Sequence, residues 1–253
     1  FIHLLAYTYD ADYMGQTNAL LYYRSSDGGE TWEIEHELIE GLGEDYFPTI
    51  NALSYEWANP VGNTIAFGYG FREYGGYVFK SYDNGDNWEM IEALNSPFSP
   101  FETYIESPDF GSGVGSFDLT LDSQGKAHVV FSRMIGNFND AGEWGYYPFT
   151  DGVIYWNEDM DPLDTTLISS YTTEYLEENG YLCGWMLSDE PITIPQGQPN
   201  YANAACGFPQ ISINANDRLF VSWSAIAPGF STGGSPDLFY RHIVMNASFD
   251  GGN

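Results

Sequence analysis

Carboxylates are the most numerous side chains in this sequence that could take part in a reaction. Thirty-six Asp and Glu residues stand against seven Lys and Arg residues, a formal net charge of -29. A pair of carboxyl groups can supply the acid and the base that cleave a glycosidic bond. With so many carboxylates some pair always lies at a plausible separation, so Glu102 with Glu106 is weak evidence. The sequence therefore predicts no catalytic residue.

Arginines are the second group with chemical potential, because a guanidinium can clamp a carboxylate in a bidentate pair. Arg24, Arg218 and Arg241 are expected within strands or in the turns that join them. Arg72 and Arg133 follow predicted strands, from where they could reach a ligand. We therefore take Arg72 and Arg133 as candidate ligand-binding residues.

Metal and thiol chemistry leave weaker signals. Asp159, Asp161 and Asp164 lie close together, but no calcium-loop spacing is present. The sequence predicts no metal ligand and identifies no cofactor, although calcium stays open as a stabilising ion.

Cys183 and Cys206 could form one disulfide or remain two buried thiols, and their spacing does not decide between these two states.

Charge and hydrophobicity exclude two classes of partner. Seven cations are too few to form the basic patch that nucleic acid binding needs. No apolar stretch approaches about 20 residues, so membrane insertion is not expected. A strongly acidic, well-solvated surface suits an extracellular protein.

One short turn motif occurs three times, at Ser25–Trp32, Ser81–Trp88 and Ser248–Asn253. The shared pattern is S-x-D-x-G-x-T-W, in which Asp can accept hydrogen bonds from the turn and Gly can supply a positive φ. The Trp can start the next strand and bury a large apolar face. We interpret these residues as structural: Ser25, Asp27, Gly29, Thr31, Trp32, Ser81, Asp83, Gly85, Trp88, Ser248, Asp250 and Gly252.

This motif resembles the Asp box (BNR repeat) of sialidase-like propellers. The resemblance implies an all-β fold, a β-propeller of four-stranded antiparallel blades with Asp-box turns. Relatives of this type have about six blades, so we expect the chain to be a portion of a larger propeller. Residues 121–130 and 147–156 resemble secreted propeller proteins of Bacteroidota, which implies a secreted or cell-surface location.

Strand patterns around the motifs also repeat. Phe47–Ile50 matches Phe208–Ile211, with Ser116–Leu119 as a looser copy, and each is followed by further aromatic strands. We predict a single propeller region, divided into a partial blade at 1–46, a blade plus loop at 47–115, a blade plus long insertions at 116–207, and a partial blade at 208–253.

Function is expected on the face opposite the box turns. Three long loops fall there, at about 92–115, 134–151 and 170–207. Aromatic side chains with carboxylates and amides suit a sugar, although most of these aromatics are expected to pack their own loops. The candidate ligand-binding residues on this face are Arg72, Arg133, Tyr104, Glu106, Trp144, Tyr146 and Tyr147.

Two functions follow as hypotheses. The first is a non-catalytic module that binds a glycan or an extracellular protein, or that builds a surface assembly. The second is a sialidase-like or other glycoside hydrolase with part of its active site outside this segment. Sialidases use three arginines with a Tyr nucleophile activated by Glu and an Asp acid/base, and no such arginine triad can be assembled here.

Overall fold

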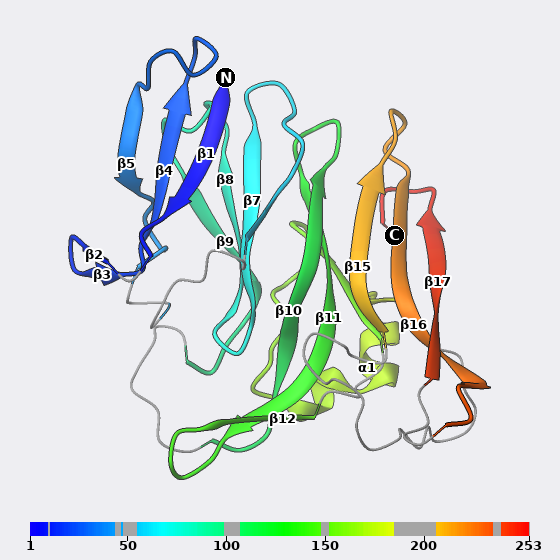
Figure 1. Cartoon of the computed structure of the whole chain (residues 1–253). Coiled ribbons are helices and arrows are strands. Elements are labelled where there is room, and N and C mark those ends of the chain that lie inside the picture. The colour runs from blue at the N-terminus through cyan, green and yellow to red at the C-terminus, as the bar shows by residue number, and fades with distance from the viewer. Residues whose placement is uncertain are drawn as a thin grey trace.

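A computed structural model describes residues 1–9, 11–43, 47, 55–98, 107–147, 152–184, 206–234 and 239–252. In this described part the chain forms four antiparallel sheets and one two-stranded hairpin (Figure 1). The prediction of an all-β antiparallel fold is confirmed. Within the same residues, no helix has the length and apolar character needed to cross a membrane.

The first and second sheets come from the N-terminal part of the chain. The first sheet has the order β1-β4-β5 and contains β1 (Ile2–Tyr7), β4 (Leu20–Ser25) and β5 (Ile34–Leu38). A small hairpin of β2 (Asp12–Tyr13) and β3 (Gln16–Thr17) lies between β1 and β4 in the chain. The second sheet contains β6 (Tyr55–Trp57), β7 (Ile65–Arg72), β8 (Gly75–Ser81) and β9 (Glu89–Leu94).

The third sheet is the largest and carries the described helices. It contains β10 (Phe110–Leu121), β11 (Ala127–Phe138), β12 (Trp144–Tyr147), β13 (Val153–Asn157) and β14 (Leu182–Gly184). The 3-10 helix η1 (Ile168–Tyr171) and the short α1 (Thr173–Glu178) lie between β13 and β14 in the chain. The fourth sheet contains β15 (Cys206–Ile213), β16 (Leu219–Ser231) and β17 (Phe239–Ser248).

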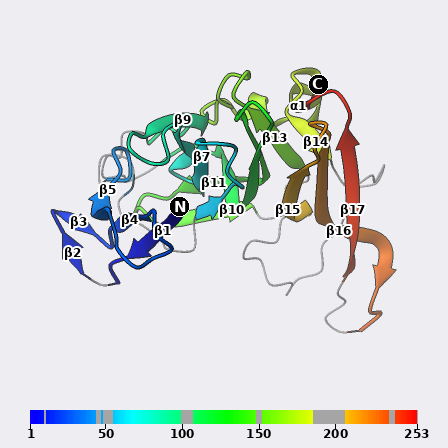
Figure 2. The same cartoon turned by 90° about the horizontal axis from the view of Figure 1, so that it is seen from above.

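The four sheets follow one another along an open arc, as Figure 2 shows from above. Strand β10 packs against β7 of the second sheet on one side and against β15 of the fourth sheet on the other. None of the sheets closes on itself. This succession of separate antiparallel sheets is propeller-like.

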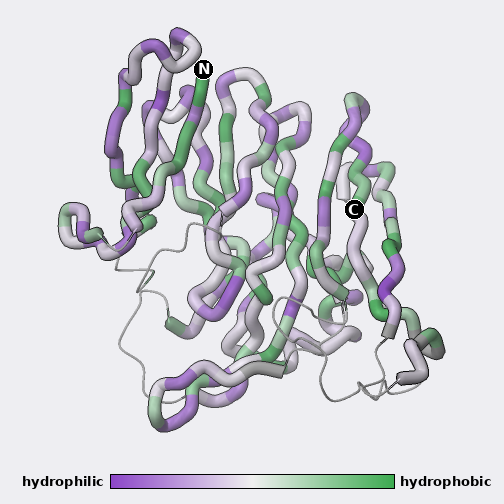
Figure 3. The backbone as a smooth tube through the Cα atoms, viewed as in Figure 1, coloured by the Kyte–Doolittle hydropathy of each residue, from purple (hydrophilic) through white to green (hydrophobic). Residues whose placement is uncertain are grey.

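Aromatic residues fill the spaces between neighbouring sheets. Phe67 and Phe79 of the second sheet are fully buried in a cluster with residues of the first sheet, and Trp156 lies in the cluster between the second and third sheets. Facing sheets lie roughly 10 Å apart, and large rings span that distance. In Figure 3 the hydrophobic residues run along the strands while hydrophilic residues gather at many of the turns.

The three motif turns repeat one hydrogen-bond pattern. In the first turn the Ser25 hydroxyl donates to Asp27 Oδ1 at 2.8 Å and accepts from Gly29 N at 2.8 Å. Asp27 also accepts from Thr31 N at 2.9 Å and from the Thr31 hydroxyl at 2.6 Å. These bonds, above all that from the Thr31 hydroxyl, lower the pKa of Asp27 to about 2.

The second and third turns follow the same scheme. Asn87 takes the place of the Thr, and its side-chain amide donates to Asp83 Oδ2 at 2.8 Å. In the third turn the Ser248 hydroxyl donates to Asp250 at 2.7 Å and accepts from Gly252 N at 2.8 Å. In all three turns the aspartate accepts hydrogen bonds within its own turn, as a structural role requires.

The inner strand of the second sheet is not where the sequence pattern placed it. The strand that pairs with β7 is β6, with Tyr55 opposite Tyr69 and Trp57 opposite Phe67, whereas Phe47 is buried outside any strand. Residues 48–50 of the predicted strand lie outside the described residues. The strand paired with β7 is therefore Tyr55–Trp57 and not Phe47, the one described residue of the predicted strand.

Two predicted loops also contain regular structure. Strand β11 runs on to Phe138 and pairs with β12, so most of the loop predicted at 134–151 is a strand extension with a tight turn. The segment predicted as a loop from residue 170 holds α1 and β14, which is the outer strand of the third sheet. Strand β10 runs across residue 115, which is the predicted boundary between the blades at 47–115 and 116–207.

Candidate functional site

The two candidate arginines do not meet on one surface. Arg72 ends β7, has a side chain 43% exposed, and lies with its Nε 3.5 Å from Glu73 Oε2. Arg133 lies inside β11 and is only 4% exposed. Its guanidinium donates to the Tyr171 carbonyl oxygen and, at 3.2 Å, to Thr173 Oγ1. Arg133 thus anchors η1 and α1 to the third sheet rather than following a strand toward a ligand.

The remaining candidates on the long-loop face give little evidence of a binding surface. Trp144 packs against Phe110 and Phe138, with ring centroids 5.4 Å and 5.1 Å apart, in a small aromatic cluster. Tyr104 and Glu106 lie outside the described residues, as do the side chains of Tyr146 and Tyr147.

Both cysteines are free thiols. Cys206 is buried, and the Cys183 thiol donates to the Val153 carbonyl oxygen at 3.3 Å. Burial raises the pKa of Cys183 to about 12, which favours the protonated thiol at neutral pH. The structure therefore favours two thiols over a disulfide. Among the described residues, no group of three or more His, Cys, Asp and Glu side chains is placed to hold a metal ion.

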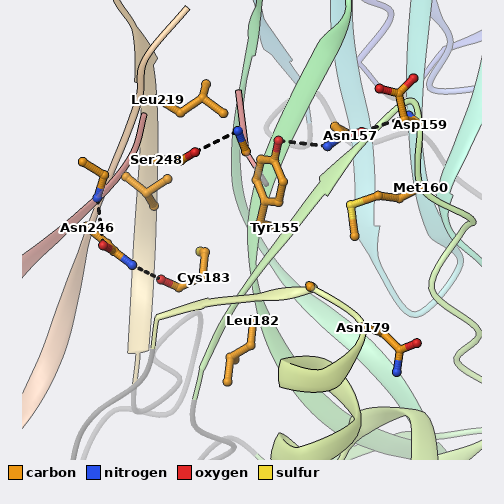
Figure 4. Close-up of a pocket in the computed structure, with 14 residues that line it drawn as sticks. Tyr155, Asn157, Asp159, Met160, Asn179, Leu182, Cys183, Leu219, Asn246 and Ser248 are labelled. Carbon is orange, nitrogen blue, oxygen red and sulfur yellow. Dashed lines mark hydrogen bonds between the residues drawn. The ribbon is translucent and has the colours of Figure 1, made fainter. Parts of the chain in front are cut away.

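A pocket of about 490 Å³ lies between the third and fourth sheets (Figure 4). This volume is within the usual range for small-ligand sites. Figure 4 shows Asn246 and Ser248 of β17 facing Tyr155 and Asn157 of the third sheet. The lining residues are Tyr155, Asn157, Asp159, Met160, Asn179, Gly180, Leu182, Cys183, Leu219, Val221, Asn246, Ala247, Ser248 and Gly252. We define them as the inter-sheet pocket.

At the two earlier sheet junctions, a long cationic side chain of one sheet contacts the next sheet. Arg24 of β4 reaches the second motif turn, at Ser81–Trp88, where it donates to Asn84 O at 2.9 Å and to Asp86 Oδ1 at 2.6 Å. Lys80 of β8 reaches the third sheet, where its Nζ lies 2.7 and 2.8 Å from the two Glu158 carboxylate oxygens. Long cationic side chains therefore bridge the first and second junctions.

Asn157 holds the corresponding position at the third junction. Arg24, Lys80 and Asn157 each pair with the second residue of the neighbouring strand. The short Asn157 side chain stays within its own sheet, donating to the Tyr155 hydroxyl at 3.0 Å and accepting from Asp159 N at 2.9 Å. It does not bridge to the next sheet, and a pocket opens beside it.

Neutral amides supply much of the polar lining of the inter-sheet pocket. Asn246 donates to the Cys183 carbonyl oxygen and Asn179 to that of Tyr175, both at 2.9 Å. An Asn amide has two N–H groups, so each retains one that bonds to no described residue. The apolar part of the lining comes from Met160, Leu182, Leu219 and Val221.

Asp159 is the one carboxylate among the described lining residues, and it is already paired. Its Oδ2 lies 2.8 Å from Lys126 Nζ. The hydrogen bond from Lys126 and the charge of that ammonium lower the pKa of Asp159. The described lining residues therefore do not include the pair of carboxyl groups that glycosidic cleavage uses.

The Tyr155 hydroxyl is hydrogen-bonded to His128 Nδ1 at 2.7 Å, an arrangement found in reactive tyrosines as well as in structural ones. The same arrangement occurs in the first sheet, where His3 Nδ1 lies 2.8 Å from the Tyr22 hydroxyl. In both cases a glycine of a motif turn in the following sheet lies directly against the tyrosine hydroxyl, Gly85 against Tyr22 and Gly252 against Tyr155. Burial raises the pKa of Tyr155 to about 12. A pair that repeats in two sheets is a packing device, so we assign Tyr155 to the scaffold.

Sequence patterns did not point to this pocket. Cys183, Ser248 and Gly252 were singled out for a disulfide or a turn, and the other lining residues for no binding role. The one available signal is the change from Arg24 and Lys80 to Asn157 at equivalent strand positions. That signal has meaning only once the strand registers are known.

Comparisons with known proteins find no matching family and no matching curated protein. Among solved structures, one similar protein is an ulvan lyase of polysaccharide lyase family PL25, bound to -[GlcA(1-4)Rha3S]-. Its TM-score is 0.46 at 11% sequence identity, and the match covers 91% of this chain and 48% of the lyase chain. Another is a xylan β-1,4-xylosidase from Bacillus halodurans C-125, with a TM-score of 0.26 at 11% sequence identity. That match covers 97% of this chain and 50% of the xylosidase chain. The chain thus spans about half the length of these two proteins. Likeness at this level carries no conclusion about function.

Proposed function

We propose that this chain is a non-catalytic glycan-binding module and that the inter-sheet pocket is its site. The observation that carries the proposal is the composition of the lining, which combines the neutral amides of Asn157, Asn179 and Asn246 with the apolar side chains of Met160, Leu182, Leu219 and Val221. A sugar ring carries hydroxyl groups around its edge and C–H groups on its faces. Amide N–H groups can bond the hydroxyls, and aliphatic side chains can cover the C–H faces.

The absence of acid–base machinery in the described pocket lining supports binding without cleavage. Glycosidases place two carboxyl groups roughly 5 to 9.5 Å apart, whereas Asp159 is paired with Lys126. The sialidase-like alternative also needs clustered arginines, and Arg133 is held inside the third sheet. The hydrolase hypothesis remains the competing outcome of the test below.

We further propose that the four sheets belong to a larger propeller of about six blades in a secreted or cell-surface protein. The repeated box turns and the open arc of separate sheets support this architecture. The strongly acidic composition suits an extracellular surface.

Glycan-array binding followed by calorimetry on the tightest glycan tests the proposed function. Met160→Trp should fill part of the pocket and weaken binding at least ~10-fold, because steric exclusion removes contacts on both walls. Met245→Trp is the matched control, since Met245 is 69% exposed and lies outside the pocket lining. It should bind as the unmodified chain does.

Two outcomes would contradict the proposal. Binding to no glycan on the array would reject a glycan-binding module. Turnover of a fluorogenic glycoside panel that includes an α-sialoside, lost in Arg72→Ala, would instead establish a hydrolase on the long-loop face. Arg133 is unsuitable for that test, because its removal would release η1 and α1.

A further inference from the structure

We infer that the inter-sheet pocket takes uncharged sugar units and discriminates against uronates and sialates. This inference rests on the proposed function and specifies its ligand class. It follows from the charges at the pocket, where no described lining residue is a cation.

Recognition of a sugar carboxylate calls for a cation within hydrogen-bond distance, best of all a bidentate arginine. Lys126 is the cation placed beside the lining, and its ammonium is 2.8 Å from Asp159 Oδ2. Arg241, on β17, directs its guanidinium to Ser224, with Nε donating to the hydroxyl and Nη2 to the carbonyl oxygen, each at 2.8 Å. An acidic sugar would therefore lose hydration without gaining an ion pair.

The rim charge opposes an acidic ligand as well. The Asp159 side chain is 75% exposed at the pocket. A second carboxylate brought close to Asp159 would be repelled even in bulk water. The net charge of -29 adds a long-range repulsion that salt screens only in part. A neutral sugar meets neither penalty, and the amide N–H groups of the pocket still match its hydroxyls.

Matched oligosaccharides test the inference. Cello-, xylo-, manno- and maltohexaose supply the neutral set, while hexagalacturonate and sialyllactose supply the acidic set. At least one neutral probe should bind the chain at least ~10-fold more tightly than either acidic probe. Its affinity should change less than about twofold between 50 and 500 mM NaCl, because neutral recognition is not screened.

Asp159→Asn isolates the electrostatic part of the argument. Removing the carboxylate frees Lys126, so affinity for the acidic probes should rise by a larger factor than affinity for the neutral probe. Asp140→Asn, an exposed substitution in the turn between β11 and β12, is the control with the same change in net charge. It should alter neither.

The outcomes separate the inference from the proposed function. Tighter binding of acidic than of neutral probes, or an Asp159→Asn variant no better than Asp140→Asn on acidic probes, would overturn the neutral-sugar inference and leave a glycan-binding module in place. Failure of every neutral and acidic probe, on the array as well as in solution, would overturn both.

Discussion

Gly85 shows at the scale of one residue why the box turns tolerate so little change. Its φ is +87°, which favours glycine, and a Cβ at this position would overlap the Tyr22 hydroxyl. Gly252 of the third turn stands in the same relation to Tyr155. The glycine thus serves both the turn conformation and the close approach of the turn to the preceding sheet.

Substitution of two glycines can separate these roles. Gly28→Ala meets only the backbone strain of φ +80°, since no atom lies within 4 Å of a new Cβ, and should cost about 1 kcal/mol. Gly85→Ala must also displace Tyr22 and should cost at least ~2 kcal/mol more in free energy of unfolding. Urea denaturation measures both. Equal losses would show that contact with Tyr22 contributes nothing.

His128 should make stability depend on pH. Burial lowers its pKa in the folded chain below the ordinary 6.5. The unfolded chain therefore takes up the proton first, so the free energy of unfolding is highest above pH about 6.5 and falls as the pH drops below it.

Urea titrations at pH 7 and pH 5.5 check this dependence. His128→Gln should reduce the loss of stability between the two pH values, while the exposed His36→Gln should leave it unchanged. A loss that stays the same in His128→Gln would mean that another group carries the pH dependence.

At the scale of elements, paired cations close the junctions between sheets. Lys80 is 2% exposed between the second and third sheets and meets both oxygens of Glu158. Lys126 and Asp159 form a pair of equal length on the surface, where the Asp159 side chain is 75% exposed. Burial, not distance, distinguishes the two pairs.

Removal of each lysine should therefore have different consequences. Lys80→Met leaves a largely buried carboxylate unpaired and should lower the free energy of unfolding by about 3 kcal/mol, with part of the loss recovered in Lys80→Met/Glu158→Gln. Lys126→Met should cost much less, because the pair it breaks is exposed to solvent. Similar losses at both positions in urea denaturation would contradict the assignment of Lys80 as a junction residue.

At the scale of the whole molecule, the dominant electrostatic feature is the net charge of -29. Carboxylates repel one another across the arc of sheets, and this repulsion opposes the compact state. The few cations that the structure places at junctions relieve it only locally.

Salt should consequently raise the melting temperature. Calorimetric scans in 20 and 300 mM NaCl should show a higher Tm at the higher concentration, because the Debye length shortens. KCl should act equally. CaCl₂ at the same ionic strength is expected to give the same rise, and a larger one would reveal the calcium site that the sequence left open. A Tm that falls with NaCl would contradict the repulsion argument.

Short-range patterns predicted much of the fold but missed registers. The box turns were predictable because Ser, Asp and Gly act within eight residues of one another. The inner strand of the second sheet was not, since Tyr55–Trp57 takes the ladder place of Phe117–Leu119 and shares with it only a three-residue order of aromatic, acidic and apolar side chains. Pairing partners lie many residues away, and a local motif match cannot identify them.

The sequence by itself determined the all-β class, the three structural turns and the acidic surface, because each follows from composition or from residues close together in the chain. Only the tertiary structure decided that Arg133 is an anchor and that both cysteines are thiols. It also decided the pocket, which brings residues near 157, 180 and 246 together. Those placements depend on how whole sheets pack, and the short Asn157 leaves its space where longer cations close the other junctions.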